Sequence, residues 1–397
     1  MVGGGHTRLA GMEDIFNRRV AKVLPDKEGL NKLMQERKIR VYLGIDPTGG
    51  QLHIGHAIGI KKLMEFAAAG HEAILLFGTG TVLVGDPSQR DSAREAITPE
   101  EIEANIQTWK DQVKPIVDFD KVEVRQNGDW LTKLTIKDLI NIASNISSVQ
   151  LFKRDNFDRR IKSGDTVWYH ETMYPLFQGY DSVVMDVDLE IGGSDQEFNM
   201  LIGRELQKKM NNKEKFVLTT PMINGTDGQP MSKTSGNCVW LQDPPEDMFG
   251  KLMSVSDDQI IPYLELCTDV PMDEVNDLKS QLDGDANPKD IKQRMAWEIT
   301  KIWHDESSAN QARDGFNSQF AGNELPSDIE TKQVETGERN LADLLVETGL
   351  ASSKSEARRL IEQGGVRLNQ NKVNADTVNV NSGDVLQAGK RRFIRIS

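Results

Sequence analysis

Residues 39–77 have the sequence IRVYLGIDPTGGQLHIGHAIGIKKLMEFAAAGHEAILLF, and this stretch decides the fold. Apolar residues alternate from Ile39 to Ile45, which is the period-two pattern of a strand. The segment DPTGG then stops the strand, and apolar residues recur at helical spacing as far as Gly70. The apolar run EAILLF predicts a second, buried strand. A strand, a helix and a strand in this order form a βαβ unit, which predicts a parallel sheet with helices on both faces.

The rest of the chain extends this α/β unit. Residues 186–193 (DVDLEIGG) alternate again, and residues 194–210 have helical spacing, with Ser194 and Glu197 in the S-x-x-E pattern of a capping box. We expect a sheet domain over residues 35–243, with a charged, mostly helical insertion at about 95–165. The predicted flanking parts are an N-terminal extension (1–34), a helical domain (244–325), a polar linker (326–338) and a small domain of helices and strands (339–397).

The composition is that of a soluble, globular protein. Of the 397 residues, 38% are hydrophobic and 27% charged, and no apolar stretch approaches the roughly 18–20 residues that span a bilayer. The first residues lack the apolar core of a signal peptide, so none is expected. Two cysteines are too few for a disulfide framework or a structural zinc cluster, which favours a reducing, cytoplasmic setting.

Charge is distributed unevenly along the chain. The formal net charge is −13, which taken alone argues against binding to nucleic acid. Residues 351–397, however, contain nine basic and four acidic side chains, so this tail carries +5 and the remainder −18. Such asymmetry indicates a polyanion-binding module attached to an acidic body.

Two of the six histidines, His53 and His56, flank Gly55 where the predicted strand gives way to the predicted helix. Free N–H groups at a helix start favour anions, and Gly55 lets a nucleotide approach the backbone closely. The alternatives are two partly exposed histidines that cap the helix, or a shared metal ion, for which no third ligand is near. The segment GTGTVL (78–83) lacks the last glycine of a dinucleotide fingerprint, and the chain contains no P-loop.

A second motif, DGQPMSKTSGN (227–237), follows the sheet region. One ammonium and several hydroxyls in a glycine- and serine-rich loop suit the β and γ phosphates of a nucleotide. Taken alone, the same segment could equally be a solvated loop with an ordinary lysine. The order and separation of LHIGH and MSKTS make the pair far more specific than either motif.

Together the two motifs resemble HIGH and KMSKS, the signatures of class I aminoacyl-tRNA synthetases. The chain is similar in particular to the bacterial-type tyrosyl-tRNA synthetases, from about Leu30 to the C-terminus, through YLGIDPT, GDPS, NGDWL, YPLFQGYD, IGGSDQ and the tail. This resemblance implies a tyrosine–tRNA ligase that forms tyrosyl-adenylate from tyrosine and ATP and then charges tRNA(Tyr). It also implies a Rossmann-like catalytic domain, an α-helical domain and a small α+β RNA-binding domain that resembles a ribosomal protein.

The resemblance also implies roles for individual residues. The expected catalytic set is His53, His56, Lys233, Thr48 and Thr234. The expected ATP-binding set adds Gly44, Asp46, Gly55, Arg90, Arg94, Gly193, Asp195, Met222, Ile223, Met231 and Ser232. Tyrosine is expected to contact Tyr42, Asp46, Thr81, Asp86, Asn127, Tyr174, Gln178, Asp181 and Gln196, with Tyr42 and Asp181 hydrogen-bonded to its phenolic hydroxyl. ATP is expected as a substrate, with Mg²⁺ on its phosphates; no protein metal site and no prosthetic group are expected.

The basic tail is expected to hold the RNA. SSKSEARRLIEQGGVRLNQNKV (352–373) resembles an RNA-binding module that grips the long variable arm and anticodon stem of the cognate tRNA. The expected RNA-binding residues are Lys354, Arg358, Arg359, Arg367, Lys372, Lys390, Arg391 and Arg392. The alternative for this tail is a lysine-rich surface helix and a tail that binds other molecules without specificity. The resemblance further implies a homodimer, and no membrane partner.

The sequence departs from the KMSKS pattern in two places. Pro230 occupies the first lysine position, which removes one cation and stiffens the loop entrance, and Thr234 replaces the last serine while keeping a hydroxyl. Two other functions stay open at this point. Tryptophanyl-tRNA synthetases share the catalytic fold but lack the phenol-reading pair and this tail, and a catalytically silent RNA-binding protein could retain the fold.

Overall fold

The computed structural model describes residues 15–87, 97–232, 235–284, 286–320, 329–369, 371–373, 375–389 and 392–397. It divides into two compact units, Met1–Arg313 and Asp314–Ser397. Each unit is described by itself below.

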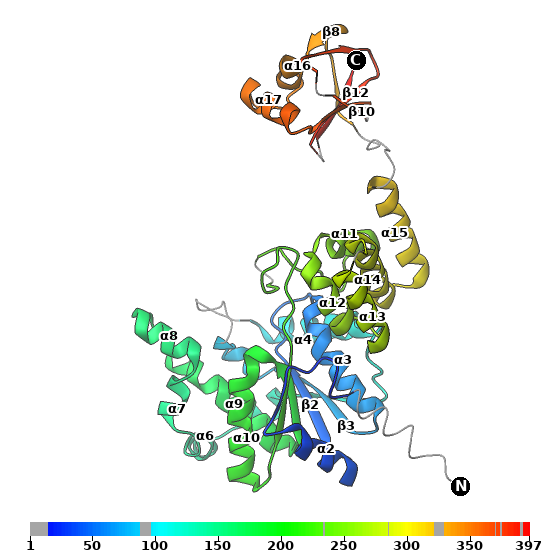
Figure 1. Cartoon of the computed structure of the whole chain (residues 1–397). Helices are drawn as coiled ribbons and strands as arrows, with labels where there is room; N and C mark the ends of the chain where they lie inside the picture. Colours follow the sequence, from blue (N-terminus) through cyan, green and yellow to red (C-terminus); the bar gives the residue numbers. More distant parts are fainter. Residues whose placement is uncertain are drawn as a thin grey trace, which may run out of the picture. The chain divides into compact units, whose positions relative to one another are not determined.

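The first unit is built on a six-stranded sheet with the order β1-β6-β5-β2-β3-β4. The strands are β1 (Lys22–Leu24), β2 (Arg40–Ile45), β3 (Glu72–Phe77), β4 (Val122–Gln126), β5 (Leu189–Gly193) and β6 (Phe216–Thr220). All neighbouring strands are parallel except β1, which pairs antiparallel with β6 at one edge. The predicted α/β fold with a parallel sheet is therefore confirmed, and β2 lies at its centre (Figure 1).

Helices cover both faces of this sheet because successive side chains of a strand point to opposite sides. On one face, Leu43 of β2 packs against Gly59 of α3 (Ile54–Ala68). On the other face, Tyr42 of the same strand packs with Met185 of α9 (Tyr174–Met185). The neighbouring helix α10 (Glu197–Asn211) lies side by side with α9 (Figure 1).

The predicted insertion at about 95–165 is partly wrong. Its helices are α4 (Pro99–Val113), α5 (Gly128–Leu131), α6 (Ile136–Ala143), α7 (Ser148–Phe152) and α8 (Asp155–Ser163). Between α4 and α5, however, β4 pairs with β3 as an edge strand of the main sheet. The first half of this stretch is therefore a crossover of the α/β fold itself, and only the helices after β4 lie outside the strand ladder.

The predicted capping box at Ser194 is also wrong. The Ser194 hydroxyl donates to the Thr220 carbonyl oxygen (2.9 Å) instead of capping a helix. A short 3₁₀ turn, η4 (Ser194–Gln196), precedes α10, whose N-cap is Gln196. The Glu197 carboxylate pairs with Lys22 (2.8 Å) on β1. Both side chains of the predicted capping box therefore form tertiary contacts and do not cap the helix.

The predicted N-terminal extension (1–34) does not stand apart from the sheet domain. Its described part contains β1 and most of α2 (Lys27–Glu36). Before them, the Arg18 guanidinium donates to the carbonyl oxygens of Leu264, Glu265, Thr268 and Val270. The extension therefore ties the sheet to the helical region.

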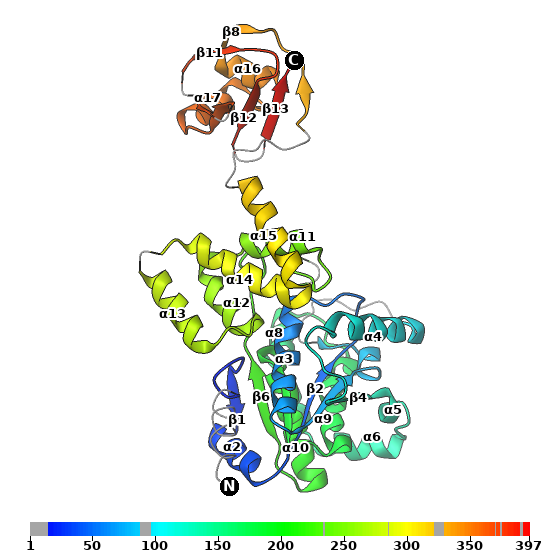
Figure 2. The ribbon, with the colours of Figure 1, turned by 90° about the vertical axis from the view of Figure 1, so that its right-hand side faces the viewer.

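That helical region follows β6, as predicted. It contains α11 (Pro245–Ser254), α12 (Ile260–Cys267), α13 (Met272–Asp283), α14 (Pro288–Trp303) and α15 (Glu306–Phe320). Helices α11 to α14 gather beyond one end of the sheet (Figure 2). In the described part of the chain, no helix is long and apolar enough to cross a bilayer.

The second unit is a small α+β domain. Its elements are β7 (Thr331–Lys332), β8 (Gly337–Asn340), α16 (Leu341–Glu347), α17 (Lys354–Glu362), β9 (Val366–Leu368), β10 (Asn371–Lys372), β11 (Thr377–Val380), β12 (Val385–Ala388) and β13 (Arg392–Ile396). The two helices pack over a five-stranded sheet around buried Leu344, Leu386 and Ile394. Strand β7 pairs with β13, so residues 331–332 belong to this sheet and not to the predicted linker.

Candidate active site

The LHIGH turn connects β2 to α3 at the carboxyl end of a central strand. His53 is the N-cap of α3, and its backbone N–H donates to His56 Nδ1 (3.2 Å). The two imidazole centroids are 3.8 Å apart. Helix α4 holds the preceding turn, because Trp109 Nε1 donates to the Gly49 carbonyl (2.6 Å) and Gln112 Oε1 accepts from Leu52 N–H (2.8 Å). Both imidazoles therefore sit on a rigid support beside a helix N-terminus.

The segment that follows the MSKTS motif pairs directly with this turn. Ile54 N–H donates to the Val239 carbonyl (3.0 Å), and Leu241 N–H donates to the Leu52 carbonyl (2.9 Å). Lys233 and Thr234 themselves lie outside the described residues, as do Arg90 and Arg94. The chain on both sides of Lys233 is nevertheless fixed close to the two histidines.

The described ends of this loop are held by Asn237. Its Oδ1 accepts from Ser232 N–H (2.9 Å) and its Nδ2 donates to the Pro230 carbonyl (3.1 Å). Met231 is buried and its N–H approaches the Ile223 carbonyl (3.4 Å). Ile223 in turn packs 3.4 Å from the position that a Cβ on Gly55 would take. The resemblance places Met222 and Ile223 beside the adenine of ATP, and we call them the predicted adenine segment. This segment, the loop and the start of α3 thus adjoin one another.

Tyr42 and Asp181 come together deep in the same unit. Their exposed fractions are 1% and 2%. Asp181 accepts from Trp130 Nε1 (2.8 Å) and from Asn127 Nδ2 (3.0 Å), and Tyr42 shares a hydrogen bond with Ser182 Oγ (3.0 Å). Burial raises the pKa of Asp181 and of Tyr42 well above their ordinary values. Two polar groups are thus held in an apolar environment, where a matching polar partner gains most.

Asp46 is linked by hydrogen bonds both to Tyr174 and, through Thr81 and Asn127, to Asp181. Its Oδ1 accepts from Thr81 Oγ1 (2.7 Å) and its Oδ2 from Tyr174 Oη (3.0 Å). Asn127 Nδ2 also donates to Thr81 Oγ1 (3.0 Å). Burial, followed by the charge of Asp46, raises the pKa of Tyr174 well above its ordinary value. Five of the residues predicted to contact tyrosine therefore form one chain of hydrogen bonds, in the order Tyr174, Asp46, Thr81, Asn127 and Asp181.

Asp86, Asp195 and Gln196 form a neighbouring cluster. Gln196 Nε2 donates to Asp86 Oδ2 (2.8 Å) and to Asp195 Oδ2 (3.0 Å). A Cβ on Gly193 would lie 2.4 Å from Asp195 Oδ1, so glycine keeps this carboxylate close to the strand end. Gln178, which is also predicted to contact tyrosine, donates through Nε2 to the buried Glu190 (3.0 Å).

Sequence reasoning missed several residues of this region. Trp130 donates to Asp181, while Ser182, Glu190 and Lys215 form a buried polar group behind Tyr42. One sequence signal was present for Glu190, because it is a charged residue in the apolar alternation DLEIGG. Lys215 carries no such signal in NNKEKF, where it follows another lysine and a glutamate in a charged stretch.

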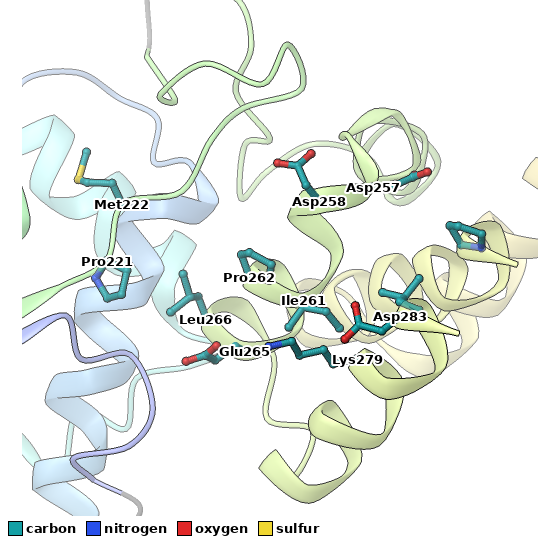
Figure 3. A pocket seen from close by; sticks show the side chains of 12 residues that line it. Pro221, Met222, Asp257, Asp258, Ile261, Pro262, Glu265, Leu266, Lys279 and Asp283 are labelled. Atoms are coloured by element: carbon teal, nitrogen blue, oxygen red, sulfur yellow. The ribbon is translucent and has the colours of Figure 1, made fainter. Parts of the chain in front are cut away.

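A hollow of about 650 Å³ lies next to the predicted adenine segment (Figure 3). Pro221 and Met222 border one side and helices α12 and α13 the other. Four acidic side chains and one lysine line it: Asp257, Asp258, Glu265, Asp283 and Lys279. This charge balance disfavours phosphates in the hollow.

The second unit carries the predicted RNA-binding cations. Those that the structure describes are exposed: Lys354, Arg358, Arg359, Arg367, Lys372 and Arg392. Strand register puts Lys372 opposite Arg367, while Arg392 reaches Glu356 on α17 (3.3 Å). Lys390 and Arg391 lie outside the described residues.

Comparison with known proteins identifies the family. A model described as tRNA synthetases class I (W and Y) matches residues 34–321, and a model described as tyrosine–tRNA ligase SYY-like C-terminal domain matches residues 322–395. The chain belongs to the class I synthetases of this W and Y family. The resemblance inferred from LHIGH and MSKTS is therefore confirmed.

Curated members of the W and Y family match along nearly the whole chain. A tyrosine–tRNA ligase of Thermotoga maritima is 41% identical over 96% of both chains, and one of Oleidesulfovibrio alaskensis is 41% identical over 95% of this chain and 96% of the relative. Solved structures share the fold at lower identity. The tyrosyl-tRNA synthetase of Archaeoglobus fulgidus complexed with L-tyrosine has a TM-score of 0.62 at 20% identity, covering 77% of this chain and 99% of the other.

Proposed function

We propose that the chain activates L-tyrosine with ATP and transfers the tyrosyl group to tRNA(Tyr), the reaction named for its curated relatives. A carboxylate oxygen of tyrosine attacks the α-phosphorus of ATP, and the bond to the pyrophosphate oxygen breaks. A ribose hydroxyl at the 3′ end of the tRNA then takes the tyrosyl group from the adenylate. The observation that carries the proposal is the pairing of the LHIGH turn with the segment after MSKTS, through Ile54–Val239 and Leu52–Leu241.

No protein nucleophile is needed for this chemistry, so positioning and charge stabilisation supply the rate. We assign His53 and His56, with Thr48, to the phosphates at the N-terminus of α3. Lys233 and Thr234 are assigned to the pyrophosphate from the motif, with Arg90 and Arg94. Backbone at Gly44, Gly55 and Gly193, the Asp195 carboxylate, and the segments Met222–Ile223 and Met231–Ser232 are assigned to the nucleoside and its phosphates.

The tyrosine side chain is assigned to the buried pair. Tyr42 and Asp181 hydrogen-bond the phenolic hydroxyl, and phenylalanine would leave both polar groups unpaired. In tyrosyl-tRNA synthetases this effect gives discrimination on the order of 10⁵, a value that comes from that enzyme class and not from this structure. Asp46, Asp86, Tyr174, Gln178 and Gln196, flanked by Thr81 and Asn127, are assigned to the ammonium and carboxylate end.

We assign Mg²⁺ to the phosphates of ATP. Among the described residues, no three His, Cys, Asp or Glu side chains are grouped to hold a metal ion. Mg²⁺ commonly takes most of its ligands from phosphates and water, with one or two carboxylates. Such an ion would neutralise charge on the departing pyrophosphate.

The second unit is proposed to bind tRNA through its exposed cations, since phosphate contacts need local charge. We retain a division into a catalytic domain up to residue 243, a helical domain to about 325 and an RNA-binding domain to the C-terminus, with the corrections at β1, β4 and β7. Cys238 and Cys267 are both buried thiols, which supports the expected cytoplasmic setting.

We also propose a homodimer. Large apolar side chains are exposed on neighbouring helices after β4: Ile136, Ile140, Val149, Phe152 and Ile161. Such an accumulation of exposed apolar surface marks protein contacts. Sedimentation velocity tests it: wild type should sediment as a dimer, and Ile140→Asp should shift it toward monomer, whereas a monomeric wild type contradicts the proposal.

Tyrosine-dependent exchange of pyrophosphate into ATP tests the activity. Tyrosine should support exchange and tryptophan should not. Exchange with tryptophan alone would favour the other branch of the W and Y family, and tRNA binding without any exchange would favour a catalytically silent RNA-binding protein.

Lys233→Ala tests the loop. We expect it to slow adenylate formation about 10²-fold or more while tyrosine affinity changes less than twofold, because the ammonium acts on the phosphates only in the transition state. Stopped-flow adenylate formation and equilibrium binding measure the two quantities, and equal losses in both would refute the role.

A further inference from the structure

Behind the phenol-reading pair lies a buried charged group that the proposed mechanism does not use. Lys215 and Ser182 are 0% exposed and Glu190 is 2% exposed. The Lys215 ammonium contacts the Glu190 carboxylate and donates to Ser182 Oγ (2.8 Å). Ser182 Oγ lies 3.0 Å from Tyr42 Oη. A buried ion pair is usually neutral or unfavourable compared with apolar packing, so its position next to a recognition residue calls for a functional explanation.

The register of the sheet explains why Glu190 matters to Tyr42. The two residues are direct partners on the parallel strands β2 and β5. An ionised carboxylate only accepts hydrogen bonds, so an uncompensated Glu190 would draw the Tyr42 phenolic proton toward itself. Its oxygens are instead occupied by Lys215 and by Gln178 Nε2 (3.0 Å). Lys215 offsets the negative charge of Glu190, which weakens the pull of this carboxylate on the Tyr42 proton.

Ser182 then determines the direction of the remaining hydrogen bonds. An ammonium only donates, so Ser182 Oγ accepts from Lys215 and has one proton of its own to give. Its distance to Glu190 Oε2 is 3.5 Å, which is long for an O–H···O bond, whereas Tyr42 Oη is at 3.0 Å. The shorter distance favours donation from Ser182 to Tyr42, which leaves the Tyr42 proton to point away from Ser182.

We propose that Lys215, acting through Ser182 and Glu190, is a positioning residue that orients the Tyr42 hydroxyl to donate to the phenolic oxygen of bound tyrosine. The substrate hydroxyl then donates to Asp181, whose two oxygens already accept from Trp130 and Asn127. The hydrogen bonds run in one direction from Lys215 to Asp181. This inference rests on the roles proposed above for Tyr42 and Asp181.

The test compares tyrosine with phenylalanine, since only tyrosine has the hydroxyl that this chain of hydrogen bonds reads. In pyrophosphate exchange, Ser182→Ala should lower the tyrosine-to-phenylalanine ratio of kcat/KM about tenfold, through a higher KM for tyrosine and with phenylalanine kinetics within twofold. Ser182→Ala leaves the Lys215–Glu190 pair in place. Lys215→Met should lower the ratio at least as much.

Two further variants separate positioning from folding. In Lys215→Met/Glu190→Gln no buried charge is left unpaired, and the new amide can donate to Ser182, so the ratio should return to within threefold of wild type. Lys213→Met is the matched control: this lysine pairs with Asp186 and Asp188 (3.3 and 3.0 Å) and not with the Tyr42 group, so the ratio should not change.

Tyr42→Phe provides the reference for interpretation. If it leaves the ratio unchanged, the assignment of Tyr42 itself is wrong and the inference falls with it. If Tyr42→Phe lowers the ratio but Ser182→Ala does not, only the inference is overturned. Equal losses for tyrosine and phenylalanine in Ser182→Ala would also overturn it, because they would indicate a merely structural group.

Discussion

Gly78 shows how closely the residues proposed to bind tyrosine are packed at the level of single atoms. A Cβ on this residue would lie 1.9 Å from Asp46 Oδ1 and 2.4 Å from Thr81 Oγ1. We expect Gly78→Ala to displace Asp46 and to weaken tyrosine binding about tenfold or more, as measured by isothermal titration calorimetry. Gly250→Ala is the matched control: it lies in α11 with nothing within 4 Å of the new Cβ. It should leave binding unchanged and add roughly 0.5–1 kcal/mol of stability.

Residues of the site differ in how far sequence could reveal them. Tyr42, Asp181 and the two histidines belong to sequence motifs that are specific to the family: YLGIDPT, YPLFQGYD and LHIGH. Lys215 and Ser182 have ordinary neighbours, and their importance arises only when β5, β6 and α9 bring them behind Tyr42. A contact between residues so far apart in the chain leaves no local pattern to detect. Gln178 stands in a specific motif, but its contact with Glu190 likewise depends on the folded arrangement and could not be predicted locally.

At the scale of elements, the strongly patterned pieces were predictable and the short ones were not. Strands β2 and β3 and helix α3 follow clear periodicities. Strand β1 has three residues and β7 two, which is too short for alternation to show. Strand β4, VEVRQ, is an edge strand with two charges, so it lacks the apolar run of a buried strand. Such elements form because a neighbouring strand offers free hydrogen-bonding groups.

The N-terminal segment and α12 are joined by Arg19, which we expect to matter for stability. Its guanidinium is 3% exposed, donates to the Leu266 carbonyl (2.8 Å) and pairs with Glu65 and Asp269. Arg19→Ala should lower the free energy of unfolding by about 3 kcal/mol, because it leaves buried acceptors unpaired. Urea unfolding measures the change. Lys32→Ala, at an exposed pair 3.9 Å apart, is the control and should change stability by less than about 0.5 kcal/mol.

In the second unit, Glu356 links α17 to β13 and gives this unit a defined response to acid. The Ser352 hydroxyl and N–H, with Arg392, lower the pKa of Glu356 from 4.5 to about 2. Because the folded pKa is the lower one, the stabilisation is present above pH 4.5 and is lost as pH falls from 4.5 to 2. Carbon-13 NMR titration should find the carboxyl pKa near 2 in wild type and closer to 4.5 in Ser352→Ala. Identical titrations in the two proteins would contradict this account.

At the scale of the whole molecule, the two units divide the chemistry. The residues assigned to tyrosine and ATP lie in Met1–Arg313 and the tail cations in Asp314–Ser397. The net charge of −13 conceals this division, which the sequence shows only when the tail is counted separately. An acidic body reduces unspecific attraction to nucleic acid, so the proposed RNA binding would depend on the exposed cations of the tail.

This division predicts that RNA binding and amino-acid activation can be changed separately. Arg358→Gln/Arg359→Gln should weaken tRNA(Tyr) binding and leave tyrosine-dependent pyrophosphate exchange within twofold of wild type. Each lost phosphate contact should lower the slope of log K against log salt concentration by about 0.7–0.9, so the double variant should lose roughly 1.4–1.8. Filter binding at several salt concentrations gives the slope. Lys32→Gln/Lys38→Gln removes the same charge from the first unit and should leave the slope unchanged. An equal loss of slope in both double variants would mean that overall charge, and not the tail surface, holds the RNA.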